Sequence, residues 1–210
     1  MTKILIVDDH AIVRDGLRLI IGDVPDMEAA GEARNGNEVL EKVRRDCYDL
    51  VLLDISLPRM DGLEVLKILK REKPDLPVLI LSMHPEEQYA VRAFKAGASG
   101  YLTKEGASKE LIAAIRKVSG GEKYVTPSLA QKLALYLDTV SEKPLHEKLS
   151  DREYQVMLLL VSGKQTREIA EELALSIKTI GTYKTRILEK MRMKNTTELT
   201  LYAIKNGLVN

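Results

Sequence analysis

The 210-residue sequence has little of several residue types, and each shortage excludes a class of protein. A single cysteine, Cys47, cannot form an internal disulfide, and with only 3 histidines the chain offers no ligand cluster for zinc. No stretch approaches the roughly 20 uncharged apolar residues of a membrane span, and the N-terminus lacks the apolar run of a signal peptide. We therefore expect a cytoplasmic protein with no membrane segment, in which Cys47 is a small buried apolar residue.

The composition is that of a folded protein with room for two small domains. Hydrophobic residues make up 45% of the chain and charged residues 30%, with only 7 Pro and 13 Gly. The net charge of +1 hides an asymmetry: residues 1–120 carry 18 Lys/Arg against 20 Asp/Glu, whereas residues 150–210 carry 10 against 7. Six basic residues and one acid lie within 178–194, so an anionic partner is expected for that segment.

The first 120 residues alternate short β-branched apolar runs with longer helical patterns. The expected strands are Lys3–Val7, Met27–Ala33, Leu50–Leu53, Val78–Leu81 and Gly100–Leu102. The expected helices lie near 11–21, 37–46, 62–72, 86–95 and 108–119. This alternation predicts an α/β domain, a (βα)5 flavodoxin-like fold in which helices cover both faces of a parallel sheet of strand order 2-1-3-4-5.

The strand pattern stops near Gly121, and a different organisation follows. Residues 121–148 are interpreted as a linker, with a helical stretch at Leu129–Val140 and a flexible, polar boundary at Ser141–Lys148. Ser150 and Glu153 have the spacing of a capping box, which predicts that an all-α domain begins there. Its four helices are expected near 151–162, 166–173, 177–191 and 196–206, so the domains are 1–120 and 149–210.

Polar residues follow four of the predicted strands at the carboxyl edge of the sheet, where ligands of such folds bind. They are Asp8, Asp9, Asp54, Ser82 and Lys104. Three crowded carboxylates repel one another unless a cation lies between them, and their oxygens suit Mg²⁺. Asp54 could then attack a phosphorus atom while Lys104 and Ser82 hold the phosphoryl oxygens, which would give an aspartyl phosphate.

A single polar residue at a strand end carries little information, because such ends face water in any case. The complete set at four strand ends favours a site. His10, beside the acidic pair, begins the next helix, and we expect it to be a solvated or capping residue and not a metal ligand.

The motifs ILIVDDH, LVLLDISLPRMDGLEVL, VLILS and GASGYLTK resemble the receiver domain of bacterial two-component response regulators, over residues 3 to about 119. The resemblance implies that Asp54 is the phosphoacceptor. It also implies that Asp9, Asp54 and the backbone carbonyl of Ser56 bind Mg²⁺ directly, with Asp8 acting through a water. Ser82, Lys104 and Tyr101 would form the switch that reshapes the face made by the fourth helix, fifth strand and fifth helix.

Two further features of the receiver-like segment bear on the resemblance. Pro58 and Gly62 are expected to shape the loop after the acceptor. Glu105 follows Lys104 where many receivers carry proline, so the cis peptide bond of those receivers is not assumed here.

The predicted helix at 177–191 is amphipathic, with an inward stripe formed by Ile180, Ile187, Leu188, Met191 and either Tyr183 or Lys184. Taken alone, this pattern also fits an ordinary solvated helix in a small bundle. The wider pattern, from Leu149-Ser-Asp-Arg-Glu153 through Leu175-Ser-Ile-Lys-Thr-Ile180 to Gly207-Leu208, resembles the LuxR-type helix-turn-helix of the NarL/FixJ subfamily.

This second resemblance implies which residues meet DNA. Those facing the major groove would be Thr179, Gly181, Thr182 and Thr185. Those available for phosphates would be Lys178, Tyr183, Lys184 and Arg186. Gly181 offers no side chain to a base, so DNA shape is expected to contribute to specificity. Dimerisation on DNA is expected through the last helix, around Glu198–Lys205.

Together these patterns predict a response regulator transcription factor, not a turnover enzyme. Its expected partners are a histidine kinase, DNA and a second copy of itself, and phosphorylation would either release an inhibitory contact or promote dimers. An aspartate-nucleophile phosphatase is one alternative, but Asp54-Ile55-Ser56 has no second carboxylate two residues on. A receiver whose helical domain binds only proteins is the other alternative, and a DNA-binding measurement distinguishes it.

Overall fold

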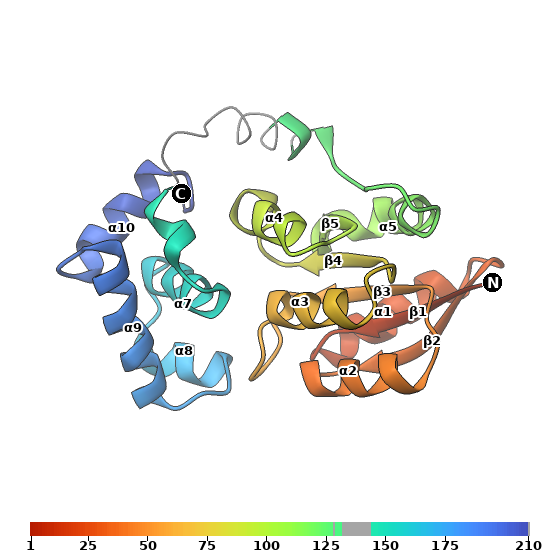
Figure 1. Cartoon of the computed structure of the whole chain (residues 1–210), viewed down its shortest axis with the longest axis horizontal. Helices are drawn as coiled ribbons and strands as arrows, with labels where there is room; N and C mark the ends of the chain where they lie inside the picture. Colours follow the sequence, from red (N-terminus) through yellow and green to blue (C-terminus); the bar gives the residue numbers. More distant parts are fainter. Residues whose placement is uncertain (128, 132–143, 210) are drawn as a thin grey trace. The chain divides into compact units, whose positions relative to one another are not determined.

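The computed structural model describes residues 1–127, 129–131 and 144–209, and it divides into two compact units, Met1–Lys132 and Leu133–Asn210 (Figure 1). Each unit is described by itself. Among the described residues, no helix is long and apolar enough to cross a membrane.

The N-terminal unit is built on a five-stranded parallel sheet of order β2-β1-β3-β4-β5, which confirms the predicted order. Its strands are β1 Thr2–Val7, β2 Met27–Ala33, β3 Leu50–Asp54, β4 Val78–Ser82 and β5 Gly100–Thr103. All five predicted strands are confirmed, with boundaries that move by no more than one residue. Both faces of β3 and β4 are buried, which explains why these strands are apolar at successive positions.

Five helices accompany the sheet: α1 Ala11–Gly22, α2 Gly36–Arg45, α3 Gly62–Glu72, α4 Glu86–Lys95 and α5 Lys104–Ser119. Leu17 of α1 and Leu111 of α5 pack into one cluster with Ile6, Leu52 and Leu81 from three strands, so α1 and α5 cover the same face. The predicted start of α5 at residue 108 is wrong. The helix begins four residues earlier because the Thr103 hydroxyl caps it by accepting from the Gly106 N–H.

The C-terminal unit contains the short 3-10 helix η1 Leu145–Lys148 and the helices α7 Asp151–Val161, α8 Thr166–Glu172, α9 Ile177–Met191 and α10 Thr196–Lys205 (Figure 1). The four predicted helices are confirmed. The expected flexible boundary is helical at η1, where His146 Nδ1 lies 2.9 Å from the Tyr202 hydroxyl. Most of the helical stretch predicted at 129–140 lies outside the described residues.

The predicted capping box of Ser150 and Glu153 is present at the start of α7. Glu153 also accepts a hydrogen bond from Lys190 Nζ at 2.6 Å, so the start of α7 is tied to the end of α9. Ile180, Ile187 and Met191 are the buried residues of α9, which confirms most of the predicted inward stripe. This packing fixes α9 on the bundle with its opposite side exposed.

Candidate functional site

The carboxyl edge of the sheet holds a buried acidic pocket. Asp8 follows β1, and Asp54 is the last residue of the neighbouring strand β3; each is only 1% exposed. Lys104, which follows β5, places its Nζ 2.6 Å from Asp8 Oδ2 and 2.8 Å from Asp54 Oδ2. The sheet order therefore brings together side chains that lie far apart in the sequence.

The electrostatics of this pocket favour a further cation. Burial raises the pKa of Asp54, and the charge of Asp8 adds to that effect, while Lys104 opposes it. Burial acts to lower the pKa of Lys104, but Asp54 and Asp8 together outweigh it, so its pKa is raised. With Asp9, three carboxylates face one ammonium group, and the pocket keeps two uncompensated negative charges.

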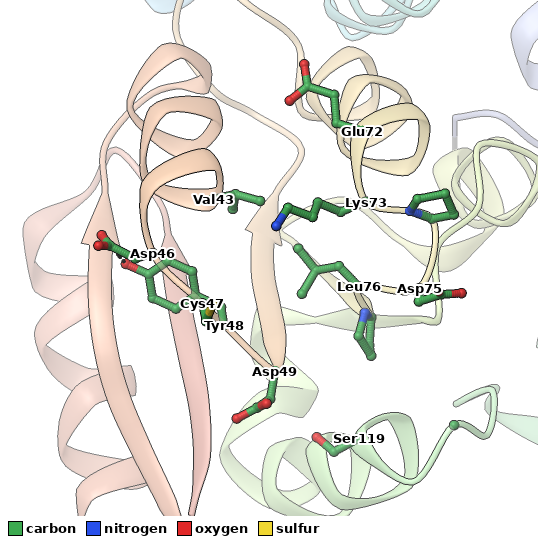
Figure 2. Close-up of a pocket in the computed structure, with 13 residues that line it drawn as sticks. Val43, Asp46, Cys47, Tyr48, Asp49, Glu72, Lys73, Asp75, Leu76 and Ser119 are labelled. Carbon is green, nitrogen blue, oxygen red and sulfur yellow. Dashed lines mark hydrogen bonds between the residues drawn. The ribbon is translucent and has the colours of Figure 1, made fainter.

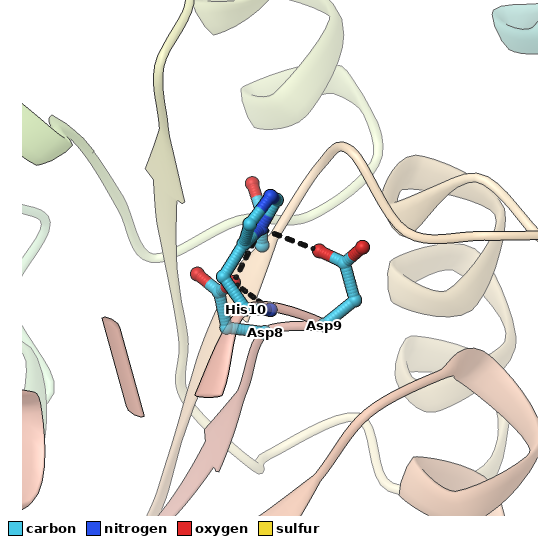
Figure 3. Close-up of side chains that lie close together, drawn as sticks. Asp8, Asp9 and His10 are labelled. Carbon is cyan, nitrogen blue, oxygen red and sulfur yellow. Dashed lines mark hydrogen bonds and ion pairs between the residues drawn. The ribbon is translucent and has the colours of Figure 1, made fainter. Parts of the chain in front are cut away.

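His10 lies at the mouth of the pocket, with its ring between the carboxylates of Asp8 and Asp9 (Figure 3). Its Nδ1 is 2.9 Å from Asp9 Oδ1 and 3.3 Å from Asp8 Oδ1. The side chain is 66% exposed, which confirms that His10 is solvated. His10 also occupies the N-cap position of α1, as predicted, but its side chain makes no capping hydrogen bond there.

The loop after Asp54 is packed against Asp54 itself. The Ser56 N–H donates to Asp54 Oδ1 at 3.2 Å, so both carboxylate oxygens of Asp54 have partners. A Cβ on Gly62 would lie 2.2 Å from the Asp54 carbonyl oxygen, a distance at which only glycine fits. Among the described residues, every peptide bond is trans, including the one between Lys104 and Glu105.

Ser82 and Tyr101 are joined through the backbone of His84. Ser82 ends β4 beside β3 and β5, and its Oγ accepts from the His84 N–H at 3.0 Å. The Tyr101 side chain is fully buried, and its hydroxyl donates to the His84 carbonyl at 2.9 Å. The sequence places both residues near the pocket but gives no sign of this link, because the backbone atoms that form it leave no mark in a sequence.

Arg14 is a residue of this region that sequence reasoning missed. Its guanidinium donates to the Asp8 carbonyl at 2.8 Å and to Glu32 Oε2 at 3.1 Å, and its side chain is 6% exposed. The sequence does contain one indication of this role, because Arg14 is a basic residue on the inward side of a predicted helix. Arg14 anchors the backbone from which Asp8 projects.

In the C-terminal unit, the predicted DNA-facing residues lie on α9 with different exposures. Lys178, Thr182, Thr185 and Arg186 are exposed, whereas Thr179, Gly181, Tyr183 and Lys184 are half-buried. The hydroxyls of Thr182 and Thr185 donate to the carbonyls of Lys178 and Gly181 at 3.0 and 3.2 Å. Their oxygens keep lone pairs that can accept hydrogen bonds from outside the helix.

A groove of about 870 Å³ lies beside α9, and Lys184 lines it. Lys164, just before α8, and Arg167, at its start, line the same groove with Thr196 and Thr200 of α10. The lining combines these basic and hydroxyl side chains with the apolar Leu160, Val161 and Ile177. Lys184 therefore faces a different direction from the exposed Thr182 and Thr185.

A second cavity lies at the opposite edge of the sheet from the acidic pocket, with a volume of about 620 Å³ (Figure 2). Cys47 lines it and is exposed, so the prediction of a buried Cys47 is wrong. The reason is local: α2 ends at Arg45, and Cys47 lies in the loop before β3. Asp46 and Glu72 on its rim already pair with Arg45 and Arg44.

Two family models match this chain. The response regulator receiver domain matches residues 4–116, and the luxR family of bacterial regulatory proteins matches residues 147–203. Response regulator GacA of Pseudomonas syringae pv. syringae is 37% identical over 212 residues, covering 100% of this chain and 99% of the relative. Response regulator UvrY of Escherichia coli is 36% identical, covering 100% and 97%.

Solved structures agree with these matches. RcsB of Salmonella typhimurium has a TM-score of 0.63 at 25% identity and covers 97% of this chain and 100% of its own. RcsB of Salmonella enterica serovar Typhimurium, bound to promoter rprA with the phosphomimetic BeF3⁻, has a TM-score of 0.64 at 25% identity, covering 96% and 98%.

A receiver fold with an acidic pocket, followed by a luxR-family helical unit, defines a two-component response regulator. The chain belongs to the NarL/FixJ-type response regulators, which are transcription factors with a LuxR-type DNA-binding domain.

Proposed function

We propose that Asp54 is the phosphoacceptor of this response regulator and that a histidine kinase, acting through it, controls DNA binding and transcription. In this proposal residues 1–120 form the receiver, 121–148 the linker and 149–210 the DNA-binding domain. The observation that carries it is the position of Asp54, which is 1% exposed at the end of β3 with Lys104 Nζ 2.8 Å from its Oδ2.

The transfer needs a carboxylate nucleophile and cations that hold the phosphoryl group. An Asp54 oxygen forms the new bond to phosphorus while the bond from phosphorus to the donor's imidazole nitrogen breaks, and its electron pair returns to that nitrogen. Lys104 and the Ser82 hydroxyl would hold the phosphoryl oxygens. Lys104, now shared between Asp8 and Asp54, supplies the positive charge.

The pocket fits Mg²⁺, since its two uncompensated negative charges match a divalent cation and Asp8, Asp9 and Asp54 gather carboxylate oxygens there, beside His10. Asp9, Asp54 and the carbonyl of Ser56 would bind the ion directly, with Asp8 acting through a water. When bound, the ion neutralises charge that develops on the phosphoryl group.

Control of the second domain would begin at Ser82 and Tyr101. A phosphoryl group that draws the Ser82 hydroxyl away from the His84 N–H would disturb the loop whose carbonyl holds Tyr101. The start of the linker lies near this region. The Thr126 hydroxyl donates to Glu86 of α4 at 2.6 Å, and the Tyr124 N–H donates to the Ser99 carbonyl at 2.9 Å.

These contacts support a path from the acceptor to the linker. Glu86 opens α4, the helix that follows the His84 loop, so a shift of that loop would reach Thr126 through a single hydrogen bond. Phosphorylation would then loosen the linker, which releases an inhibitory contact or favours dimers.

For DNA, α9 is proposed to enter the major groove with Thr182 and Thr185 toward the bases and Lys178 toward a phosphate. Thr179 and Gly181 would lie beside them, and Tyr183, Lys184 and Arg186 would contact phosphates. A homodimer would form through α10, on which Leu201 and Ile204 are 64% and 52% exposed. Two such apolar side chains on one short helix are suited to burial against a second copy.

The test is labelling of the full-length chain by a small phosphodonor with Mg²⁺, compared between wild type and Asp54→Asn. The proposal predicts one phosphoryl group per wild-type chain, none on the variant, and no sustained release of phosphate from small esters. Labelling of Asp54→Asn would refute the assignment of the acceptor. Continued turnover of esters would indicate a phosphatase in place of a regulator.

A further inference from the structure

We infer that Arg14 is a positioning residue of the acidic pocket, which holds Asp8 in place for Mg²⁺ by donating to the Asp8 carbonyl and to Glu32 at the same time. The inference rests on the proposed function, because it takes Mg²⁺ to be the cation used in phosphoryl transfer to Asp54. It adds a residue outside the group of carboxylates on which the affinity for that ion depends.

Asp8 is the first residue beyond the strand ladder of β1. The pairing of β1 with β2 and with β3 ends at Val7, one residue earlier. The Asp8 N–H still donates to the Ala33 carbonyl of β2 at 3.1 Å. The Asp8 carbonyl instead accepts from Arg14 Nη1 at 2.8 Å, in buried surroundings. A side chain therefore takes the place of a strand partner, as a buried carbonyl requires.

The same guanidinium is fixed at a second point. Arg14 Nε donates to Glu32 Oε2 at 3.1 Å, and Glu32 lies opposite Ile6 in the register of β1 and β2. Arg14 thus ties the start of α1 both to the end of β1 and to β2. A planar guanidinium holds its donors in a rigid fork, so two acceptors on two strands fix its position and, through it, that of the Asp8 carbonyl. Lysine carries its donors on one nitrogen at the end of a flexible stem and does not reproduce this arrangement.

Stability alone accounts poorly for an arginine at this position. The buried residues of α1 are Arg14, Leu17 and Ile21, so Arg14 belongs to the inward stripe of the helix. Its side chain is only 6% exposed. Removing a guanidinium from water is costly, and well-packed apolar side chains that replace a buried ion pair are often as stabilising or more so. The arginine is better explained by the place in which it holds Asp8.

The position of Asp8 matters because its carboxylate is shared. Its Oδ2 lies 2.6 Å from Lys104 Nζ, which also pairs with Asp54 at 2.8 Å. A shift of the Asp8 backbone would redistribute Lys104 between the two carboxylates, and it would move the carboxylate proposed to act on the ion through a water. Substitution of residues that orient metal ligands without touching the metal typically lowers metal affinity about 10- to 100-fold. Loss of Arg14 should therefore weaken Mg²⁺ binding while Asp54 stays reactive.

The experiment measures Mg²⁺ binding to the full-length chain by titration calorimetry, for wild type, Arg14→Met, Arg14→Lys and Arg18→Met. Methionine keeps much of the apolar stem and removes the donors, whereas lysine keeps the charge and so preserves a folded chain if Arg14→Met fails to fold. Arg18 is the matched control, because it lies one turn further along α1 and 3.6 Å from the same Glu32 but is 55% exposed.

We expect Mg²⁺ affinity to fall about tenfold in both Arg14 variants and to change less than about twofold in Arg18→Met. At saturating Mg²⁺, the maximal rate of phosphodonor labelling should stay close to that of wild type in every folded variant. The effect would then appear in the Mg²⁺ concentration that labelling requires and not in its maximal rate.

Amide resonances of the Mg²⁺-free protein give a second readout, which a purely stabilising role would not change. A hydrogen bond to a carbonyl polarises the peptide group that contains it, so the Asp9 N–H resonance reports on the bond between Arg14 and Asp8. We expect this resonance to shift in both Arg14 variants and to stay in place in Arg18→Met.

Wild-type Mg²⁺ affinity in either folded Arg14 variant would overturn the inference, and so would an equal loss of affinity in Arg18→Met. An unchanged Asp9 resonance in the Arg14 variants would overturn it independently of the metal. Absence of labelling in wild type would instead refute the proposed function, and the comparison of Asp9 resonances would still decide whether Arg14 holds Asp8.

Discussion

The ammonium group of Lys104 donates a hydrogen bond to Asp54 Oδ2 over 2.8 Å, in a position where its side chain is only 10% exposed. Asp8 shares the same ammonium group at 2.6 Å. One ammonium group thus pairs with two buried carboxylates, and its removal leaves them facing each other without compensation.

Lys104→Ala should therefore destabilise the cation-free protein by about 3 kcal/mol near neutral pH, since one partner of a buried ion pair is lost. The deficit should shrink as pH falls, because protonation of Asp54, whose pKa burial already raises, removes the repulsion. Wild type keeps this stabilisation until pH rises past the raised pKa of Lys104, above 10.5. Calorimetry across pH measures both effects.

Lys117→Ala is the control for that prediction, because Lys117 is 46% exposed and lies 4.0 Å from Glu122. Added Mg²⁺ should also narrow the gap between Lys104→Ala and wild type. A Lys104→Ala chain as stable as the control at neutral pH would contradict the description of the pocket.

Gly62→Ala should disturb the loop after Asp54 through the backbone. The added methyl would lie 2.2 Å from the Asp54 carbonyl oxygen and 2.7 Å from Ile55 Cα, so the loop must move at a cost of about 2 kcal/mol or more. Gly16→Ala in α1 has nothing within 4 Å and should instead stabilise its helix, by up to about 1 kcal/mol. Unfolding midpoints and the rate of phosphodonor labelling distinguish Gly62→Ala from Gly16→Ala. Equal midpoints and equal labelling rates in the two variants would contradict the close packing of Gly62 against Asp54.

The C-terminal unit should lose stability in acid through Glu153. Burial acts to raise the pKa of Glu153, but hydrogen bonds from Lys190 and Ser150 outweigh it and hold the pKa of this carboxyl below its usual range. Because the pKa of Glu153 is lower in the folded protein than in the unfolded chain, ionised Glu153 stabilises the fold at pH values above its pKa in the unfolded chain. This stabilisation is lost as pH falls below about 4.5 and passes the lower pKa of the folded protein. Glu153→Gln should flatten this pH dependence, and an unchanged acid profile would exclude Glu153 as its source.

Lys184→Ala should weaken DNA binding to all sequences alike, because a phosphate contact carries no base information. The slope of log affinity against log salt should fall by about one counterion. Fluorescence anisotropy at several salt concentrations measures it, with Lys117→Ala in the receiver as a charge-matched control. A loss confined to one sequence would instead place Lys184 at a base.

The architecture of the first unit follows from residue pattern alone. Short apolar runs such as Leu50–Leu53 are typical of strands buried on both faces, and the turn residues between them separate strand from helix. The clustering of Asp8, Asp54 and Lys104 could be predicted from the sheet order, because the carboxyl ends of parallel strands meet at one edge.

What the sequence could not show depends on backbone atoms and on local chain direction. Arg14 and Tyr101 donate hydrogen bonds to backbone carbonyls, those of Asp8 and His84. Every residue has such a carbonyl, so the sequence cannot identify the ones that accept these bonds. Cys47 was expected in the core because free cysteines are often buried, yet its loop lies at the rim of a cavity. The early start of α5 depends on Thr103, which is the last residue of β5 and also the N-cap of α5. The sequence pattern does not show that one residue has both roles.

The most direct test of the account is DNA affinity of the full-length chain with and without a small phosphodonor, for wild type and Asp54→Asn. Genomic fragments that the treated wild-type protein selects serve as the DNA. We predict that the phosphodonor tightens DNA binding by wild type and leaves the DNA affinity of Asp54→Asn unchanged. An equal gain in both proteins, or no gain in a wild type shown to be phosphorylated, would contradict it.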